Sequence, residues 1–80
     1  MNDFETKGAA IDAAAEVIDP VSSKSLLDAH ILDEVDAKDG VVTVRLSFPE
    51  SYPRAQRWEV EDAVADTVGK IGAKDVRVSS

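Results

Sequence analysis

The 80-residue sequence contains no cysteine and only one histidine, His30. The lack of cysteine excludes disulfides, thiol nucleophiles and thiolate metal sites. A single histidine cannot build a histidine-based zinc site, and one that stands beside leucines is more often a packing or capping residue than a ligand. We therefore expect no metal site and no cofactor.

Long apolar runs are also missing: none approaches the roughly 20 residues that cross a bilayer. The first eight residues, MNDFETKG, do not show the basic and apolar pattern of a secretion signal. We expect a cytoplasmic protein with no membrane association, folded as a single domain over residues 1–80.

Positive charge is scarce, with 9 basic residues against 16 acidic ones and a net charge of −7. This balance argues against nucleic-acid binding, because Lys and Arg normally supply the affinity for phosphate. The acids are scattered rather than gathered in a tail, which predicts a solvated acidic surface. Abundant Ala, Val and Asp with little Lys is typical of proteins from salt-loving archaea.

Motifs for catalysis are weak or absent. No serine lies in a Gly-x-Ser-x-Gly elbow. Gly69–Gly72 reads GKIG and matches the GxxG clamp of RNA-binding KH domains, but the residues after it predict a strand instead of the required helix. Asp33, Glu34 and Asp36 lack the spacing of a calcium loop, and in a strand only the last two share a face. We expect no catalytic residue and no enzymatic activity.

Near the N-terminus, an apolar stripe predicts a helix that packs on the core. Its members recur at helical spacing: Phe4, Gly8, Ile11, Ala15 and Ile18. Alanines with high helix propensity fill much of the remainder. The predicted helix runs from about Glu5 to Ile18, where Pro20 ends it.

The next segment predicts one short helical turn, capped by Ser22 or Ser23. This turn would place Leu26 and Leu27 under a sheet.

Two strands with a tight turn follow. Residues 31–37 alternate weakly, with Ile31, Val35 and Ala37 on one face, and residues 41–48 alternate cleanly. Asp39-Gly40 suits positive φ, so the two strands predict an antiparallel hairpin. The expected core residues of the second strand are Val42, Val44, Leu46 and Phe48.

A second helix begins near Pro53, a favoured first-turn residue, and ends at Gly69 or Gly72. Its apolar stripe consists of Val60, Val64, Val68 and Ile71. Residues 75–78 then form a short last strand. The order predicts an α+β fold, an α-β-β-α-β sandwich with both helices on one face of a small three-stranded sheet.

The proline loop from Ser47 to Trp58 is the most informative segment. We interpret it as a binding loop in which Tyr52 offers a ring and a hydroxyl, while Arg54 adds positive charge near a helix N-terminus. In the alternative interpretation, Ser51 caps the helix and Tyr52 covers the edge of the core. Trp58 falls off the apolar stripe, so it either covers the edge of the sheet or the first loop, or contacts another protein, and we expect partial exposure.

The segment IDPVSSKSLLDAHILDEVDAKDGVVTVRLSF, followed by the proline loop and helix, resembles the MMS-nineteen-interacting-protein family. That family includes SufT, the PaaD-type proteins and the N-terminal domain of Mrp/ApbC-type ATPases. Asp19-Pro20 stands at the family's Asp-Pro, and Tyr52-Pro53 stands at its Cys-Pro. The similarity covers nearly the whole chain, and its specificity lies in the order and spacing of the motifs.

Three departures from the family pattern affect what the resemblance implies. Val21 replaces a Glu, His30 stands where Gly is usual, and Tyr52, or Ser51 if the loop is one residue longer, replaces a reactive cysteine. The resemblance implies a role in iron–sulfur cluster assembly or maturation. Without thiolates this chain cannot hold a cluster in the usual way, which leaves an adaptor role.

The first hypothesis is therefore a non-catalytic adaptor that binds a protein partner, such as a P-loop iron–sulfur carrier ATPase or an assembly factor. The alternatives are a PaaD-like subunit of an oxygenase complex and a stand-alone interaction module. The candidate partner-binding residues are Asp19, Pro20, Ser51, Tyr52, Pro53, Arg54 and Trp58.

Overall fold

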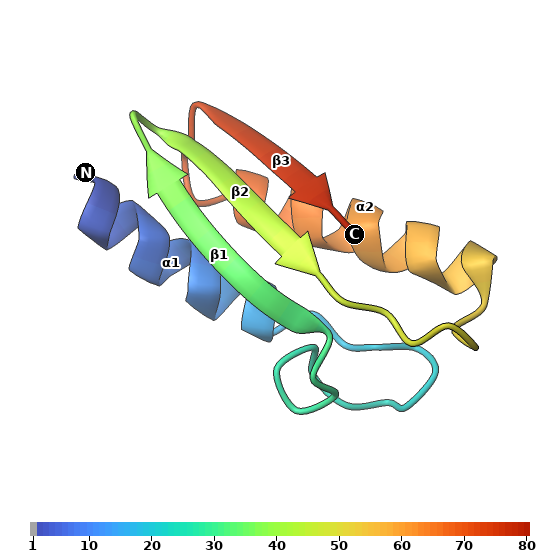
Figure 1. Ribbon diagram of the computed structural model, residues 1–80. Helices are drawn as coiled ribbons and strands as arrows, with labels where there is room; N and C mark the ends of the chain where they lie inside the picture. The colour runs from blue at the N-terminus through green and yellow to red at the C-terminus, as the bar shows by residue number, and fades with distance from the viewer. Residues whose placement is uncertain (1) are drawn as a thin grey trace.

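The computed structural model describes residues 2–80 and contains two helices and three strands. The elements follow in the order α1 (Asp3–Ala15), β1 (Leu32–Lys38), β2 (Val41–Leu46), α2 (Arg54–Gly69) and β3 (Asp75–Ser79). Both helices lie behind the same face of the sheet (Figure 1). The predicted α+β fold is confirmed.

In the sheet, the strands are ordered β1-β2-β3, with β2 in the centre. The β1–β2 pair is the predicted antiparallel hairpin, and Asp39 and Gly40 at its turn have φ of 53° and 81°. The β2–β3 pair is parallel, so the chain must cross over between them, and α2 is that crossover. The pairing of β1 with β2 shifts register between Leu32 and Glu34, which interrupts the weak alternation seen in the sequence.

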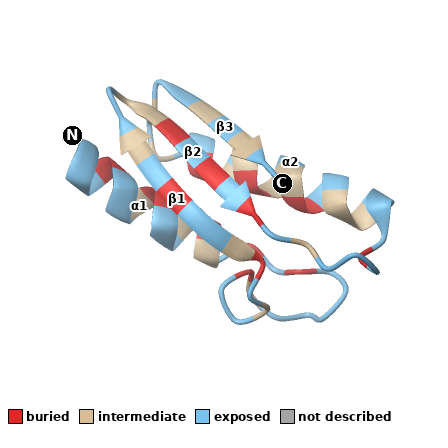
Figure 2. Cartoon of the chain, in the orientation of Figure 1, coloured by how far each residue is buried: buried red, intermediate tan, exposed pale blue. Residues whose placement is uncertain are grey.

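The core lies between the helices and the covered face of the sheet. Val42, Val44 and Leu46 are buried as predicted, while Thr43 and Arg45 between them are exposed (Figure 2). Phe48 lies beyond the end of β2 and is only half-buried.

The second helix matches its prediction. Val60, Val64 and Val68 are buried, and Ile71 follows the helix and is half-buried. Helix α2 packs against β3 and α1. The apolar stripe of this helix is therefore its core-facing side.

The first helix contradicts its prediction in both extent and orientation. It spans Asp3–Ala15, and Asn2 caps it by accepting a hydrogen bond from the Glu5 N–H at 2.8 Å. Phe4 is 87% exposed and Ile11 is 37% exposed. The buried residues of the helix are Thr6, Ala10 and Ala14. Small side chains on this side let the helix axis lie close to the sheet, and this leaves the bulkier stripe facing outward.

The short helical turn predicted after Pro20 is present, but with a different cap. The Ala29 N–H donates to the Ser25 carbonyl at 2.9 Å, and the Asp28 N–H donates to Ser25 Oγ at 3.1 Å, so Ser25 caps the turn in place of Ser22 or Ser23. Leu26 in this turn is buried as expected, but Leu27 is exposed. Before Ser25, the Asp19 side chain bonds to the backbone N–H groups of Val21 and Ser22, which competes with helix formation there. Ile18 and Ser25 also form an isolated antiparallel bridge.

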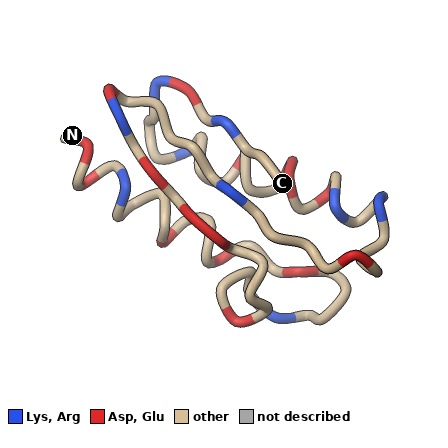
Figure 3. Tube along the Cα trace, in the orientation of Figure 1, with Lys and Arg blue, Asp and Glu red and all other residues tan. Residues whose placement is uncertain are grey.

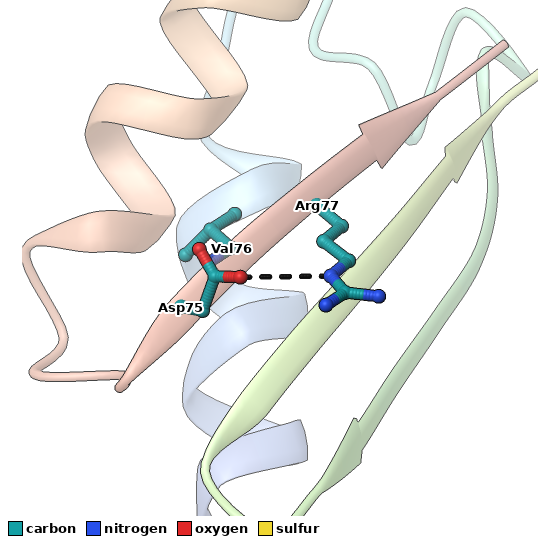
Figure 4. Close-up of polar contacts among 3 residues, drawn as sticks. All are labelled: Asp75, Val76 and Arg77. Atoms are coloured by element: carbon teal, nitrogen blue, oxygen red, sulfur yellow. Dashed lines mark hydrogen bonds and ion pairs between the residues drawn. The ribbon is translucent and has the colours of Figure 1, made fainter.

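The uncovered face of the sheet is charged. Acidic residues lie along β1, and Arg45 lies beside them on the neighbouring strand β2 (Figure 3). Arg45 Nε lies 3.7 Å from Asp33 Oδ2, and on β3 the Arg77 Nε lies 3.5 Å from Asp75 Oδ2 (Figure 4). All four side chains are largely exposed, so these pairs contribute little stability. This face is not an apolar docking surface.

Candidate functional site

The two segments singled out by the sequence, around Asp19 and around Tyr52, meet in the structure. The Tyr52 hydroxyl donates a hydrogen bond to Asp19 Oδ1, across a separation of 33 residues in the chain. Asp19 is 2% exposed and Tyr52 is 8% exposed. The bond therefore joins the loop after α1 to the loop before α2 from within the protein.

Asp19 organises its own loop. Its carboxylate accepts hydrogen bonds from the Val21 N–H at 3.1 Å, the Ser22 N–H at 3.2 Å and the Ser22 hydroxyl at 2.6 Å. Its backbone N–H donates to the Lys24 carbonyl at 2.7 Å, and its carbonyl accepts from the Ser23 N–H at 2.8 Å. A buried carboxylate is stable when it is satisfied in this way.

These contacts set the protonation of the pair. Burial alone raises the pKa of Asp19, but the hydrogen bonds from Ser22, Tyr52 and two backbone N–H groups outweigh it and hold that pKa below its usual value. Burial, followed by the hydrogen bond and charge of Asp19, raises the pKa of Tyr52. At neutral pH the pair is an ionised carboxylate with a neutral phenol.

The proline loop has its own internal support. The Tyr52 N–H donates to the Pro49 carbonyl at 3.0 Å, and the rings of Tyr52 and Phe48 lie 4.8 Å apart between centroids. The guanidinium carbon of Arg57, a residue of α2, lies over the Phe48 ring at 5.2 Å from its centroid. Tyr52 thus fixes the loop at the start of α2.

A groove of about 330 Å³ lies between the two loops. Its polar lining includes Lys24, Asp28, His30 and Ser51, and its apolar lining includes Val21, Ala29, Ile31, Pro49 and Pro53. Asp19, Ser22 and Tyr52 complete it. We name this the loop groove. It mixes apolar surface with a few polar groups, as binding sites do.

The loop groove contains no nucleophile activated by a neighbouring base. His30, its only imidazole, has φ of 59°, in the left-handed region that favours glycine. Within residues 2–80, no cluster of three or more His, Asp or Glu side chains has the arrangement of a metal site.

The predicted site residues separate into two groups. Asp19, Ser51, Tyr52 and Pro53 line the loop groove. The remaining predicted site residues do not line this groove: Pro20, Arg54 and Trp58.

Pro20 lines a smaller hollow of about 200 Å³ beside Ile18 and Glu59. Trp58 is 59% exposed, which confirms the expected partial exposure.

Two details of the loop interpretation need correction. Tyr52 is buried and its hydroxyl is engaged inside the protein, so neither its ring nor its hydroxyl is free for a partner. In the alternative interpretation Ser51 was the helix cap, but Pro53 occupies the N-cap position and no side-chain hydrogen bond caps it. Tyr52 covers the core edge and shapes the groove instead.

Sequence reasoning missed Ser22, Lys24 and Asp28 as groove residues. A signal existed for Ser22, because Asp followed by Ser three residues later is a pattern of side-chain-capped turns. No local signal links Asp19 with Tyr52, since the two lie far apart in the chain.

No family model matches this chain, and the comparison with curated proteins found no match.

None of the helices in residues 2–80 combines the length and apolar character that crossing a bilayer requires.

Proposed function

We propose that this chain is a non-catalytic adaptor that binds a protein partner at the loop groove. The observation that carries the proposal is the buried hydrogen bond from Tyr52 to Asp19, which holds two distant loops together beside a partly apolar groove. A preformed groove lowers the ordering cost of binding. The absence of an activated nucleophile within it favours binding over chemistry.

The proposed setting is cytoplasmic iron–sulfur protein maturation. It rests on the resemblance to the MMS-nineteen-interacting-protein family, whose Asp-Pro and Cys-Pro positions correspond to Asp19-Pro20 and Tyr52-Pro53. Both positions lie at the loop groove or beside it. His30, where the family usually has glycine, has positive φ, which is the backbone state that glycine favours.

The partner class that follows is a P-loop iron–sulfur carrier ATPase or an assembly factor. The domain would dock on this partner without holding a cluster, because the chain has no thiolate. In this role Tyr52 supports the fold at the position where the family carries a reactive cysteine. An oxygenase subunit as the captured partner would instead support the PaaD-like alternative.

A matched pair of variants tests the groove. Val21 and Leu27 are both exposed aliphatic residues, at 54% and 56%, but only Val21 lines the loop groove. The partner is first identified by cross-linking in the native host and then purified for titration. We expect Val21→Asp to weaken binding by about tenfold or more and Leu27→Asp to leave it within about twofold.

Equal effects of the two variants would reject the loop groove as the docking site. Circular dichroism of both variants provides the control for folding. If the purified partner has no connection with iron–sulfur proteins, the proposed setting is wrong even where the groove is correct.

A further inference from the structure

The outer side of α1 carries an apolar stripe that the rest of residues 2–80 covers only in part. Phe4, Gly8, Ile11 and Ala15 follow one another at alternate spacings of four and three residues. Phe4, Gly8 and Ile11 are exposed, and Ala15 is half-buried. We name these four residues the α1 stripe. Spacings of four and three are those of the a and d positions of a two-helix coiled coil.

The α1 stripe alternates large and small side chains. Phe4 and Ile11 are the large members, and Gly8 and Ala15 are the small ones. A Cβ added at Gly8 would meet nothing within 4 Å, so the space above it is open. A second helix can therefore approach closely at the small positions and cover the large ones.

The charges beside the stripe identify the second helix. With 3.6 residues per turn, Lys7 lies along one side of the stripe and Asp12 along the other. Both are exposed, and neither forms an ion pair within residues 2–80. In a coiled coil with an identical parallel helix, Lys7 of each copy faces Asp12 of the other, because they take the g and e positions.

An antiparallel arrangement has the opposite electrostatics. In an antiparallel pair, the residues on one side of the stripe face the same residues of the second copy, so Asp12 faces Asp12. Glu5 and Glu16 lie on that same side and add to the repulsion. Like charges brought together across an interface are unfavourable. The charge pattern therefore selects a parallel partner with the same sequence.

From these observations we propose that the chain forms a parallel homodimer in which the two copies of the α1 stripe pack together. The contact is about 20 Å long, because α1 has 13 residues that each rise about 1.5 Å. An interface of this size is below the standard class, so the dimer is weak and reversible. The α1 stripe does not line the loop groove, so this proposal does not depend on the proposed function.

Sedimentation equilibrium between about 10 µM and 1 mM tests for association. We expect the average mass to rise from monomer toward dimer over this range. Ile11→Asp should abolish the rise, while Leu27→Asp, exposed but outside the stripe, should retain it. A chain that stays monomeric throughout, or a dimer unaffected by Ile11→Asp, overturns the proposal.

Charge reversal tests the orientation. We expect Lys7→Asp and Asp12→Lys each to weaken the dimer by about threefold or more, and an equimolar mixture of the two variants to restore it. Asp12→Lys lowers the net negative charge of the protein, so general repulsion alone would strengthen its dimer. A stronger dimer for Asp12→Lys, or no recovery on mixing, rejects the parallel arrangement.

Cross-linking supplies an independent readout. The chain has no native cysteine, so a single introduced one reports on one contact. In the parallel dimer Gly8 faces Gly8 of the second copy, and Gly8→Cys should form an intermolecular disulfide on mild oxidation. Lys70→Cys, exposed beyond α2, is the control and should not. Equal cross-linking of both variants contradicts the proposed contact.

Discussion

The two helices of this protein place their bulky apolar side chains in opposite directions. In α2, Val60, Val64 and Val68 face the core. In α1, the core side carries Thr6, Ala10 and Ala14. The phenylalanine and isoleucine of α1 face outward. The strongest apolar stripe of a helix therefore does not by itself identify the side that faces the protein's own core.

The beginnings of the two helices differ as well. Helix α1 begins with an exposed side-chain cap from Asn2. Helix α2 begins at Arg54, and Pro53 before it forms no side-chain cap bond; the buried pair of Tyr52 and Asp19 lies next to this start. The start of α1 therefore depends on one local bond, whereas the start of α2 depends on tertiary contacts. Five substitutions test these differences between the helices through the free energy of unfolding.

Tyr52→Ala should have the largest effect. It removes a buried ring and leaves Asp19 with one hydrogen bond fewer. We expect the free energy of unfolding to fall by about 3–5 kcal/mol, as for other buried aromatic truncations. Urea denaturation measures the change. A loss below about 1 kcal/mol would mean that the two loops do not depend on each other.

Val64→Ala tests the core side of α2. Val64 is fully buried, so the truncation removes apolar contacts and leaves a cavity. We expect a loss of about 2–3 kcal/mol in the free energy of unfolding, measured by the same denaturation. A near-neutral result would show that α2 packs loosely.

Asp19→Asn tests the buried charge that Tyr52 contacts next to the start of α2. At neutral pH we expect a loss of about 1.5–3 kcal/mol, because hydrogen bonds to a charged acceptor are replaced by weaker ones. Asp19 has a lowered pKa in the fold, so its contribution is present above the unfolded-state pKa of about 3.9 and is lost as pH falls through the folded-state value.

The difference between the native chain and Asp19→Asn should therefore be largest near neutral pH and should shrink below about pH 4. Thermal melts of both proteins across this range measure it. A difference that stays constant to low pH would show that the charge of Asp19 is unimportant.

Asn2→Ala tests the local start of α1. The Asn2 side chain satisfies one backbone N–H of the first turn. We expect a loss of about 1 kcal/mol, with frayed first-turn amides visible by hydrogen exchange. Unchanged exchange in this turn would mean that packing alone fixes it.

Ile11→Asp should also have a small effect on folding. Ile11 is 37% exposed on the outer side of α1, and the change should lower the free energy of unfolding of the monomer by no more than about 1 kcal/mol, because part of its apolar surface is covered. Dilute samples, in which the protein is monomeric, are used for the melts. A loss comparable to that of Val64→Ala would mean that the outer side of α1 packs inside the protein after all.

The sequence was sufficient for the fold because its signals were local and agreed with one another. Alternation in residues 41–46 and the Asp39-Gly40 turn define the hairpin, and the valines of α2 define its inner side. Periodicity identified α1 but could not identify its inner side, because alanines pack in a core without giving an apolar signal as strong as Phe or Ile. Only tertiary structure decides between two possible sides of one helix.

The sequence identified the two segments that form the candidate site, but it did not indicate the contact between them. Asp19 and Tyr52 were both selected, but their hydrogen bond spans 33 residues and leaves no local pattern. The interpretation of Tyr52 as an exposed contact is wrong, and the alternative, in which Tyr52 covers the edge of the core, is confirmed. Lys24 and Asp28 also line the groove, and no local pattern in the sequence indicates this.

Strand β2 pairs with β1 in the antiparallel sense and with β3 in the parallel sense, and this difference predicts the order in which the two pairs form during folding. Strands β1 and β2 are joined by a two-residue turn, so their ladder closes a short loop. Strand β3 can pair with β2 only after the chain has passed through α2, which makes its contacts the most distant in sequence within the sheet. We expect the hairpin to gain protection first during refolding and β3 to gain it last. The shortest strand would then also be the first to open in the native state, so the amides of β3 should exchange sooner than those of β2.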